Sequence, residues 1–280
     1  MSNYKEMKVN KVLFITQEIT PYVSESEMSN TGRYLPQGIQ ERGREIRTFM
    51  PKWGNVNERR NQLHEVIRLS GMNLIIDDTD HPLIIKVASI QSARMQVYFI
   101  DNDDYFQHRQ ILTDENGEEY NDNEERAIFY ARGVLETVKK LRWCPDVIHC
   151  QGWMSAFVPL FIKKAYKEEP SFRSSKVIFS AFDDEFKQNF QDNLSDKLLL
   201  KGIEKSDIDN VISAPYSHEA IYKLAIEYSD GVIQNSEKIN PNLIEFAKSK
   251  NIPFLEYQSS ENYMDAVNNF YEEVWANSQE

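Results

Sequence analysis

Short apolar runs recur along the whole chain and predict strands. They lie at 12–16, 45–50, 83–90, 95–101, 146–150, 176–182, 230–235 and 253–257. Apolar residues at helical spacing predict helices at 31–43, 123–142, 154–168, 217–229, 240–250 and 260–277. Strands that alternate with helices in this way are typical of βαβ units with right-handed crossovers. The pattern therefore predicts an α/β fold with a Rossmann-like, doubly wound and mostly parallel sheet.

Two stretches depart from this alternation. Between 63 and 101, strands follow one another around the turn signals SGMN and DDTDHP, which predicts a small β-rich insert. The polar segment TDENGEEYNDNEE at 113–125 is expected to form an exposed loop. An EF-hand is the sharper alternative for that segment, but Gly117 follows Asp114 at the wrong spacing for that calcium loop.

The chain is expected to form one domain over 1–280, because no Pro/Ser-rich linker divides it. Its last predicted helix, 260–277, should pack back on the domain, since it carries an apolar stripe of Tyr263, Val267, Phe270, Tyr271 and Val274.

Composition narrows the choice of partners. A net charge of −12 over 280 residues argues against nucleic acid and anionic membrane, since both require a positive surface. Cys144 and Cys150 form no Cys-x-x-Cys pair, so we expect a reducing compartment and no metal site. The N-terminus has no signal-peptide core and no apolar run is long enough to span a bilayer, so a cytoplasmic protein is expected.

The segment EITPYVSESEMSNTGRYLP at 18–36 joins the first strand to the first helix. Open α/β sheets bind ligands at such strand-to-helix loops. Proteins that bind nucleotides or sugars usually place glycines there, because backbone amides then approach a phosphate closely. This loop carries serine and glutamate instead, which raises the question of what it binds.

Four ordered blocks resemble the bacterial glycogen and starch synthases, which transfer glucose from ADP-glucose to an α-1,4-glucan. They are KVLFITQEITPYVSES…GRYLPQGIQERGREIRTFMPKWG at 11–54, YFIDNDDYFQHR at 98–109, EYNDNEERAIFYARGVLE at 119–136 and PDVIHCQGWMSAFVPLFIK at 145–163. The resemblance continues more faintly through 176–186 and 228–239. It implies the N-terminal half of a GT-B glycosyltransferase fold.

The resemblance also implies what this chain lacks. Synthases of the family have two Rossmann-like domains with the active site between them, and this chain matches only the first. The second supplies the arginine and lysine that hold the ADP pyrophosphate and a glutamate near the transferred sugar. Because stabilising the departing diphosphate is the main catalytic demand, we expect no autonomous transferase activity and assign no catalytic residue.

The first domain departs from the family in its binding loops as well. The family's Lys-Thr-Gly-Gly aligns with Ser24, Glu25, Ser26 and Glu27, and the aspartate of its Leu-x-Asp-Val aligns with Asn30. Two glutamates there are expected to repel a phosphate-bearing donor by about 1 kcal/mol per close pair. The family's His-Asp-Trp-His becomes Gln151, Gly152, Trp153 and Met154, and a further family histidine aligns with Phe182.

The remaining candidates each have a structural alternative. Glu18 either contacts a ligand or shapes a turn with Pro21, and Trp153 either stacks on a sugar ring or packs in the core. His149 is expected to be a hydrogen-bonded core histidine. Asp183 and Asp184, with Glu185, either bind sugar hydroxyls or a divalent ion, or cap a helix. Tyr22, Gln151 and Trp153 are the groups available to hold a glucan chain.

Three functions follow from these observations. The first is a glucan-binding or regulatory module with a glycogen/starch synthase fold. The second is half of a split synthase, completed by a partner chain over the cleft. The third is a small-molecule domain whose ligand is neutral or cationic, which the acidic loop favours. No cofactor or metal is expected, and a second copy of the chain is a candidate to cover the cleft as a homodimer.

Overall fold

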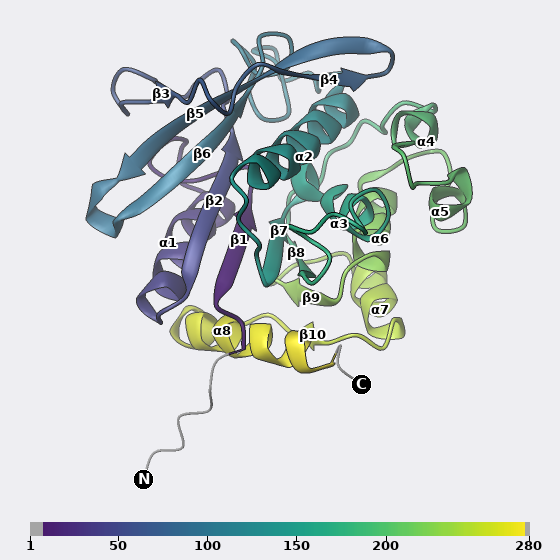
Figure 1. The fold of residues 1–280 in the computed structure, drawn as a ribbon. Coiled ribbons are helices and arrows are strands. Elements are labelled where there is room, and N and C mark those ends of the chain that lie inside the picture. Colours follow the sequence, from purple (N-terminus) through teal and green to yellow (C-terminus); the bar gives the residue numbers. More distant parts are fainter. Residues whose placement is uncertain (1–7, 278–280) are drawn as a thin grey trace.

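The computed structural model describes residues 8–277 and contains one large sheet (Figure 1). The strand order is β10-β9-β8-β7-β1-β2-β6-β5-β3, and β4 pairs with β5 outside this path. The parallel strands are β1 (Lys11–Ile15), β2 (Glu45–Pro51), β6 (Met95–Asp101), β7 (Val147–Gln151), β8 (Lys176–Ala181), β9 (Gly231–Gln234) and β10 (Phe254–Leu255). The predicted mostly parallel α/β fold is confirmed.

The β-rich insert extends the same sheet at one edge. Strands β3 (His64–Glu65) and β4 (Met72–Ile76) both pair antiparallel with the long β5 (Thr79–Ile90). Strand β5 in turn pairs antiparallel with β6. The predicted insert of 63–101 therefore includes one strand too many, because β6 lies parallel beside β2 in the main sheet.

The helices follow the predicted pattern, except that two short helices between 194 and 209 have no predicted counterpart and two predicted helices differ in their bounds. They are α1 (Glu27–Glu41), α2 (Asn123–Lys140), α3 (Val158–Lys163), α4 (Leu194–Lys197), α5 (Lys205–Asp209), α6 (His218–Glu227), α7 (Pro241–Ser249) and α8 (Ser260–Asn277), with short 3₁₀ turns η1 (Gln91–Ala93) and η2 (Trp153–Ser155). The first helix starts four residues earlier than predicted. The predicted helix 154–168 is divided into η2 and α3, with Pro159 in the first turn of α3, where proline is tolerated.

Helices cover both faces of the sheet. Alternate residues of the central strands, among them Val12, Phe14 and Val147, pack against α1 and α8. Their neighbours Leu13, Ile15 and Ile148 belong to the larger cluster that includes α2, α3 and α6. This two-sided burial explains why the central strands are almost continuously apolar. No helix of the described range 8–277 is long and apolar enough to cross a bilayer.

Helix α8 is held to the sheet by a buried histidine. The Nδ1 atom of His149 lies 2.8 Å from the Tyr271 hydroxyl, and its Nε2 lies 2.6 Å from the Ser180 hydroxyl. Burial lowers the pKa of His149 to about 3, so the ring is neutral at physiological pH. Arg44 adds a second anchor, donating to Asn268 Oδ1 at 2.8 Å and to Glu272 Oε1 at 2.9 Å. The expectation of a hydrogen-bonded core histidine agrees with this environment.

The pKa of His149 predicts acid sensitivity. Because the native pKa lies below that of the unfolded chain, unfolding takes up a proton once the pH falls below about 6.5. Native stability should therefore drop by about 2 kcal/mol between about pH 7 and pH 5 from this residue alone. In His149→Gln this pH-dependent loss of stability should disappear. Urea unfolding at both pH values would measure it. His64→Gln, at an exposed strand residue, should keep the wild-type pH dependence; an unchanged dependence in His149→Gln would contradict the assignment.

Candidate functional site

The loops that follow β1 and β7 meet where the strand order reverses. This is the position at which open α/β sheets bind ligands. The side-chain oxygen of Gln17 accepts a hydrogen bond from Met154 N at 3.2 Å, and the backbone oxygen of Gln17 accepts one from Trp53 Nε1 at 2.6 Å. Gly152 has φ +78°, and a Cβ there would lie 2.6 Å from Met28 Cε. The crossing of the two loops therefore requires glycine.

Asp184 joins this crossing to helix α6. Its Oδ2 accepts a hydrogen bond from Trp153 N at 3.0 Å, and its Oδ1 lies 2.9 Å from His218 Nε2 and also bonds to the Tyr222 hydroxyl. No helix begins at 183–185, so neither aspartate caps a helix that directly follows it. Asp184 caps the 3₁₀ turn η2, from a loop distant in sequence. Within residues 8–277, no group of carboxylate, histidine and cysteine side chains has metal-site geometry.

The serine and glutamate loop forms the N-terminus of α1. Ser26 Oγ accepts from Ser29 N at 2.9 Å, while Ser29 Oγ accepts from Ser26 N at 2.8 Å, a capping box that starts the helix at Glu27 rather than at 31. Glu27 Oε2 accepts from the Ser236 hydroxyl at 2.5 Å, and Ser236 Oγ accepts from Asp183 N at 2.9 Å. The start of α1 is thereby tied to the loops after β8 and β9.

The carboxylates of this region lie close to one another. Burial and the negative charge of Asp184 raise the pKa of Glu18, against a lowering contribution from its hydrogen bond with Ser26 Oγ at 3.4 Å. Ser24 and Glu25 are exposed beside Glu27. Carboxylates therefore border the loop crossing at the start of α1, and we call this border the acidic rim.

Four of the sequence candidates lie beneath the surface. Trp153 is 1% exposed, and its ring makes edge contacts with Phe186 and Phe190 at centroid distances of 5.7 and 6.1 Å. Tyr22 packs edge-on against a core phenylalanine, and Phe182 is buried. Gln151 is fully buried, and neither atom of its amide has a hydrogen-bond partner in the described chain. In this conformation none of the four offers a face to a sugar.

A cavity beside this acidic rim contains residues that the sequence reasoning missed. It encloses about 350 Å³ between α1, the start of α8 and the ends of β9 and β10. Tyr34 is 56% exposed and Tyr257 41%, and they are the aromatic members among the large apolar side chains exposed in 8–277. Both line this cavity, together with Glu27, Asn30, Thr31, Leu35, Asn235, Gln258, Ser260, Tyr263 and Met264. Helical spacing places Asn30 and Tyr34 on one face, but only the fold brings Tyr257 opposite them.

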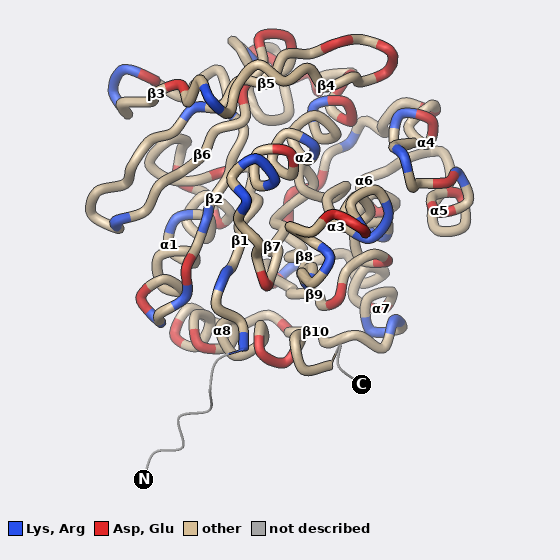
Figure 2. The backbone as a smooth tube through the Cα atoms, in the orientation of Figure 1, with Lys and Arg blue, Asp and Glu red and all other residues tan. Residues whose placement is uncertain are grey.

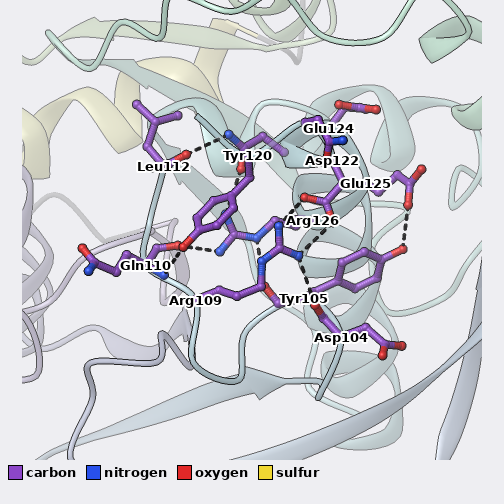
Figure 3. A network of polar contacts seen from close by, with 12 residues as sticks. Asp104, Tyr105, Arg109, Gln110, Leu112, Tyr120, Asp122, Glu124, Glu125 and Arg126 are labelled. Carbon is purple, nitrogen blue, oxygen red and sulfur yellow. Dashed lines mark hydrogen bonds and ion pairs between the residues drawn. The ribbon is translucent and has the colours of Figure 1, made fainter. Parts of the chain in front are cut away.

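A polar network at the start of α2 joins two of the sequence blocks (Figure 3). Arg126 is fully buried and donates to the backbone oxygens of Tyr105 at 2.9 Å and Gln110 at 2.6 Å. Burial lowers the pKa of Arg126 to about 9, which still leaves it charged at neutral pH. Arg109 forms a two-pronged ion pair with Asp122, with one contact at 2.8 Å. The hydrogen bonds and ion pairs of these side chains are formed within the network. The two sequence blocks therefore meet here and hold the loop 102–122 in place.

The comparisons with known proteins agree with this architecture. The family described as the starch synthase catalytic domain matches residues 11–250. A glycogen synthase from Pelodictyon phaeoclathratiforme is 32% identical over 76% of this chain and 47% of its own length. One from Chlorobium limicola is 31% identical over 81% of this chain and 50% of its own length. The chain thus spans about half the length of these curated relatives.

A solved structure shares the fold. The catalytic domain of starch synthase IV from Arabidopsis thaliana, bound to ADP and acarbose, superposes with a TM-score of 0.71 at 16% identity, covering 91% of this chain and 53% of that one. The family match over residues 11–250 and the identity to glycogen synthases over three quarters of the chain show that the protein belongs to the starch synthase catalytic domain family.

Proposed function

We propose that this synthase-like domain binds a neutral sugar, an α-1,4-glucan or a related oligosaccharide, and does not take ADP-glucose as a donor at its β1–α1 loop. The observation that carries the proposal is the cavity beside α1, where the two exposed tyrosines Tyr34 and Tyr257 lie together. Exposed apolar side chains that gather at one hollow are typical of ligand-binding grooves.

The polar groups of the cavity suit sugar hydroxyls. The amides of Asn30, Asn235 and Gln258 both donate and accept hydrogen bonds, as each hydroxyl of a sugar does. Asn235 is held in position, because its Oδ1 accepts from the Tyr263 hydroxyl at 2.7 Å. A volume of about 350 Å³ is at the lower end for small-molecule sites and suits one or two sugar rings rather than a nucleotide sugar. The Arabidopsis relative was solved with acarbose, which supports the same ligand class.

The acidic rim argues against the donor. Glu25 and Glu27 lie where the family has Thr and Gly of its Lys-Thr-Gly-Gly loop, and the capping box already occupies the amides of Ser26 and Ser29. A diphosphate placed there would meet like-charged carboxylates and fewer free N–H donors. The ligand that we propose therefore lacks the diphosphate of ADP-glucose, but it is still a sugar, as expected for this family.

The tyrosines provide the first test. Tyr34→Ala and Tyr257→Ala should each weaken binding of a maltooligosaccharide by about tenfold, because each removes a stacking face. Tyr34→Phe and Tyr257→Phe keep the ring and should retain most of the affinity, as isothermal calorimetry would report. Leu199→Ala, which truncates an exposed apolar side chain elsewhere, is the matched control. Equal affinity in the alanine variants and the wild type would remove the basis of the proposal.

The loop carboxylates provide the second test. ADP-glucose should give no saturable heat with the wild-type chain. ADP should bind Glu25→Gln/Glu27→Gln about tenfold more tightly than it binds the wild type, because two repulsive charges are gone. The control variant Glu115→Gln/Glu118→Gln makes the same change of charge in the exposed acidic loop, away from the β1–α1 loop. It should bind ADP like the wild type. Tight ADP-glucose binding with glucosyl transfer by the wild type would refute this half of the proposal.

Because the pKa of Glu18 is raised, replacing its carboxylate with a neutral side chain should stabilise the protein, by an amount that depends on pH. Protonated Glu18 supports the fold below its unfolded pKa of 4.5, and this support is lost as the pH rises through the higher native pKa. Glu18→Gln should therefore have a higher melting temperature than the wild type at neutral pH, and the difference should close below pH 4.5. Glu25→Gln, at an exposed carboxylate of the same loop, should show a smaller change in calorimetric melting. A Glu18→Gln variant less stable at neutral pH would show that the charge is instead needed.

A further inference from the structure

A second concave region lies at the amino ends of β2 and β6, the opposite end of the strands from the candidate site. Two adjoining hollows of about 430 and 610 Å³ share Arg47, Gln96 and Tyr98. Arg94 lines one of them, and Arg68 and Lys140 line the other. We call these residues the β2–β6 basic hollow. Figure 2 shows the basic segments on β2 and at the end of α2 that contribute to it.

The charges of this hollow are not neutralised by the protein. Its single lining carboxylate belongs to Glu45, which accepts a hydrogen bond from Trp143 Nε1 at 2.6 Å. Arg68 and Arg94 are exposed, and in the described chain neither side chain has a hydrogen bond or ion pair. Lys140 Nζ contacts only the backbone oxygen of Leu69, at 3.3 Å. Four cations therefore gather with one carboxylate in a chain of net charge −12.

Arg47 is fixed in the centre of the hollow. Its Nη1 donates to the Tyr98 hydroxyl at 2.8 Å, and its guanidinium lies 5.2 Å from the centroid of the Trp143 ring. Its Nε is buried and has no partner in the described residues. Arg44, a buried arginine just before β2, instead pairs with Glu272 at 2.9 Å. Arg47 therefore has no carboxylate partner within residues 8–277, and its side chain is already held in place, so it loses little conformational freedom when an anion binds.

We propose that the β2–β6 basic hollow binds a small molecule that carries a phosphate or diphosphate group. Arginine forks match the geometry of phosphate oxygens, and several cations around one hollow favour a multiply charged anion over chloride. Arg47 would contact the phosphate at the centre, while Arg68 and Arg94 close over it from either side. Because this hollow lies at the amino ends of the strands, such a ligand would not compete with a sugar bound beside α1. The proposal does not depend on the proposed sugar-binding function.

Calorimetry with pyrophosphate, at matched ionic strength in chloride, tests the proposal on the full chain. We expect saturable binding that Arg68→Gln/Arg94→Gln weakens by at least about tenfold, since two charge-assisted contacts are lost. Both side chains are exposed, so the variant should fold, which its far-UV circular dichroism would verify. Arg59→Gln/Arg60→Gln changes the charge equally at two exposed arginines of another loop and should bind like the wild type.

Arg47→Lys separates specific recognition from charge alone. Lysine keeps the positive charge but not the two-pronged fork, so pyrophosphate affinity should fall while the melting temperature without ligand changes little. Absence of saturable heat with the wild type would overturn the proposal. Equal weakening by the Arg68/Arg94 and Arg59/Arg60 double variants would also overturn it, because binding would then follow overall charge rather than the hollow.

Discussion

The N-cap of helix α1 is the constraint on which the rest of the site depends. Reciprocal hydrogen bonds between Ser26 and Ser29 start the helix at Glu27, and the contact of Glu27 with Ser236 fixes that start against the loops after β8 and β9. Successive turns then place Asn30 and Tyr34 on the same face as Glu27, toward the cavity. The residues at the start of α1 thereby make the rim acidic and form one wall of the cavity that we propose as the sugar site.

The neighbouring loop crossing is closed by the protein's own side chains. Asp184 and Gln17 satisfy the backbone amides of Trp153 and Met154, and Trp153 is enclosed by two phenylalanines. This crossing lies where the sheet topology favours a ligand, yet the Trp153 and Met154 amides are engaged by the protein itself. The accessible binding groups are displaced toward α1 and α8, where Tyr34 and Tyr257 face solvent.

The sequence predicted the fold well because long apolar runs and helical stripes are local signals. It placed α2, α6, α7 and α8 within one or two residues, and the resemblance identified the family. It missed the early start of α1, because Ser26 and Ser29 look like loop residues until they cap each other. It left open whether Trp153 stacks on a sugar ring or packs in the core, and it treated Gln151 as a group available to a ligand. The burial of both depends on contacts distant in sequence, such as those of Trp153 with Phe186 and Phe190. Tyr257 gave no signal, since its partner Tyr34 lies more than two hundred residues away in the chain.

The sugar site that we propose for this domain lies beside α1 rather than at the loop crossing. A titration of isotopically labelled protein with a maltooligosaccharide, followed through backbone amide NMR shifts, distinguishes these two positions. We expect saturable shifts concentrated at Asn30, Tyr34, Asn235 and Gln258. Shifts confined to Gly152, Trp153 and Met154, or no saturable shift at all, would contradict it.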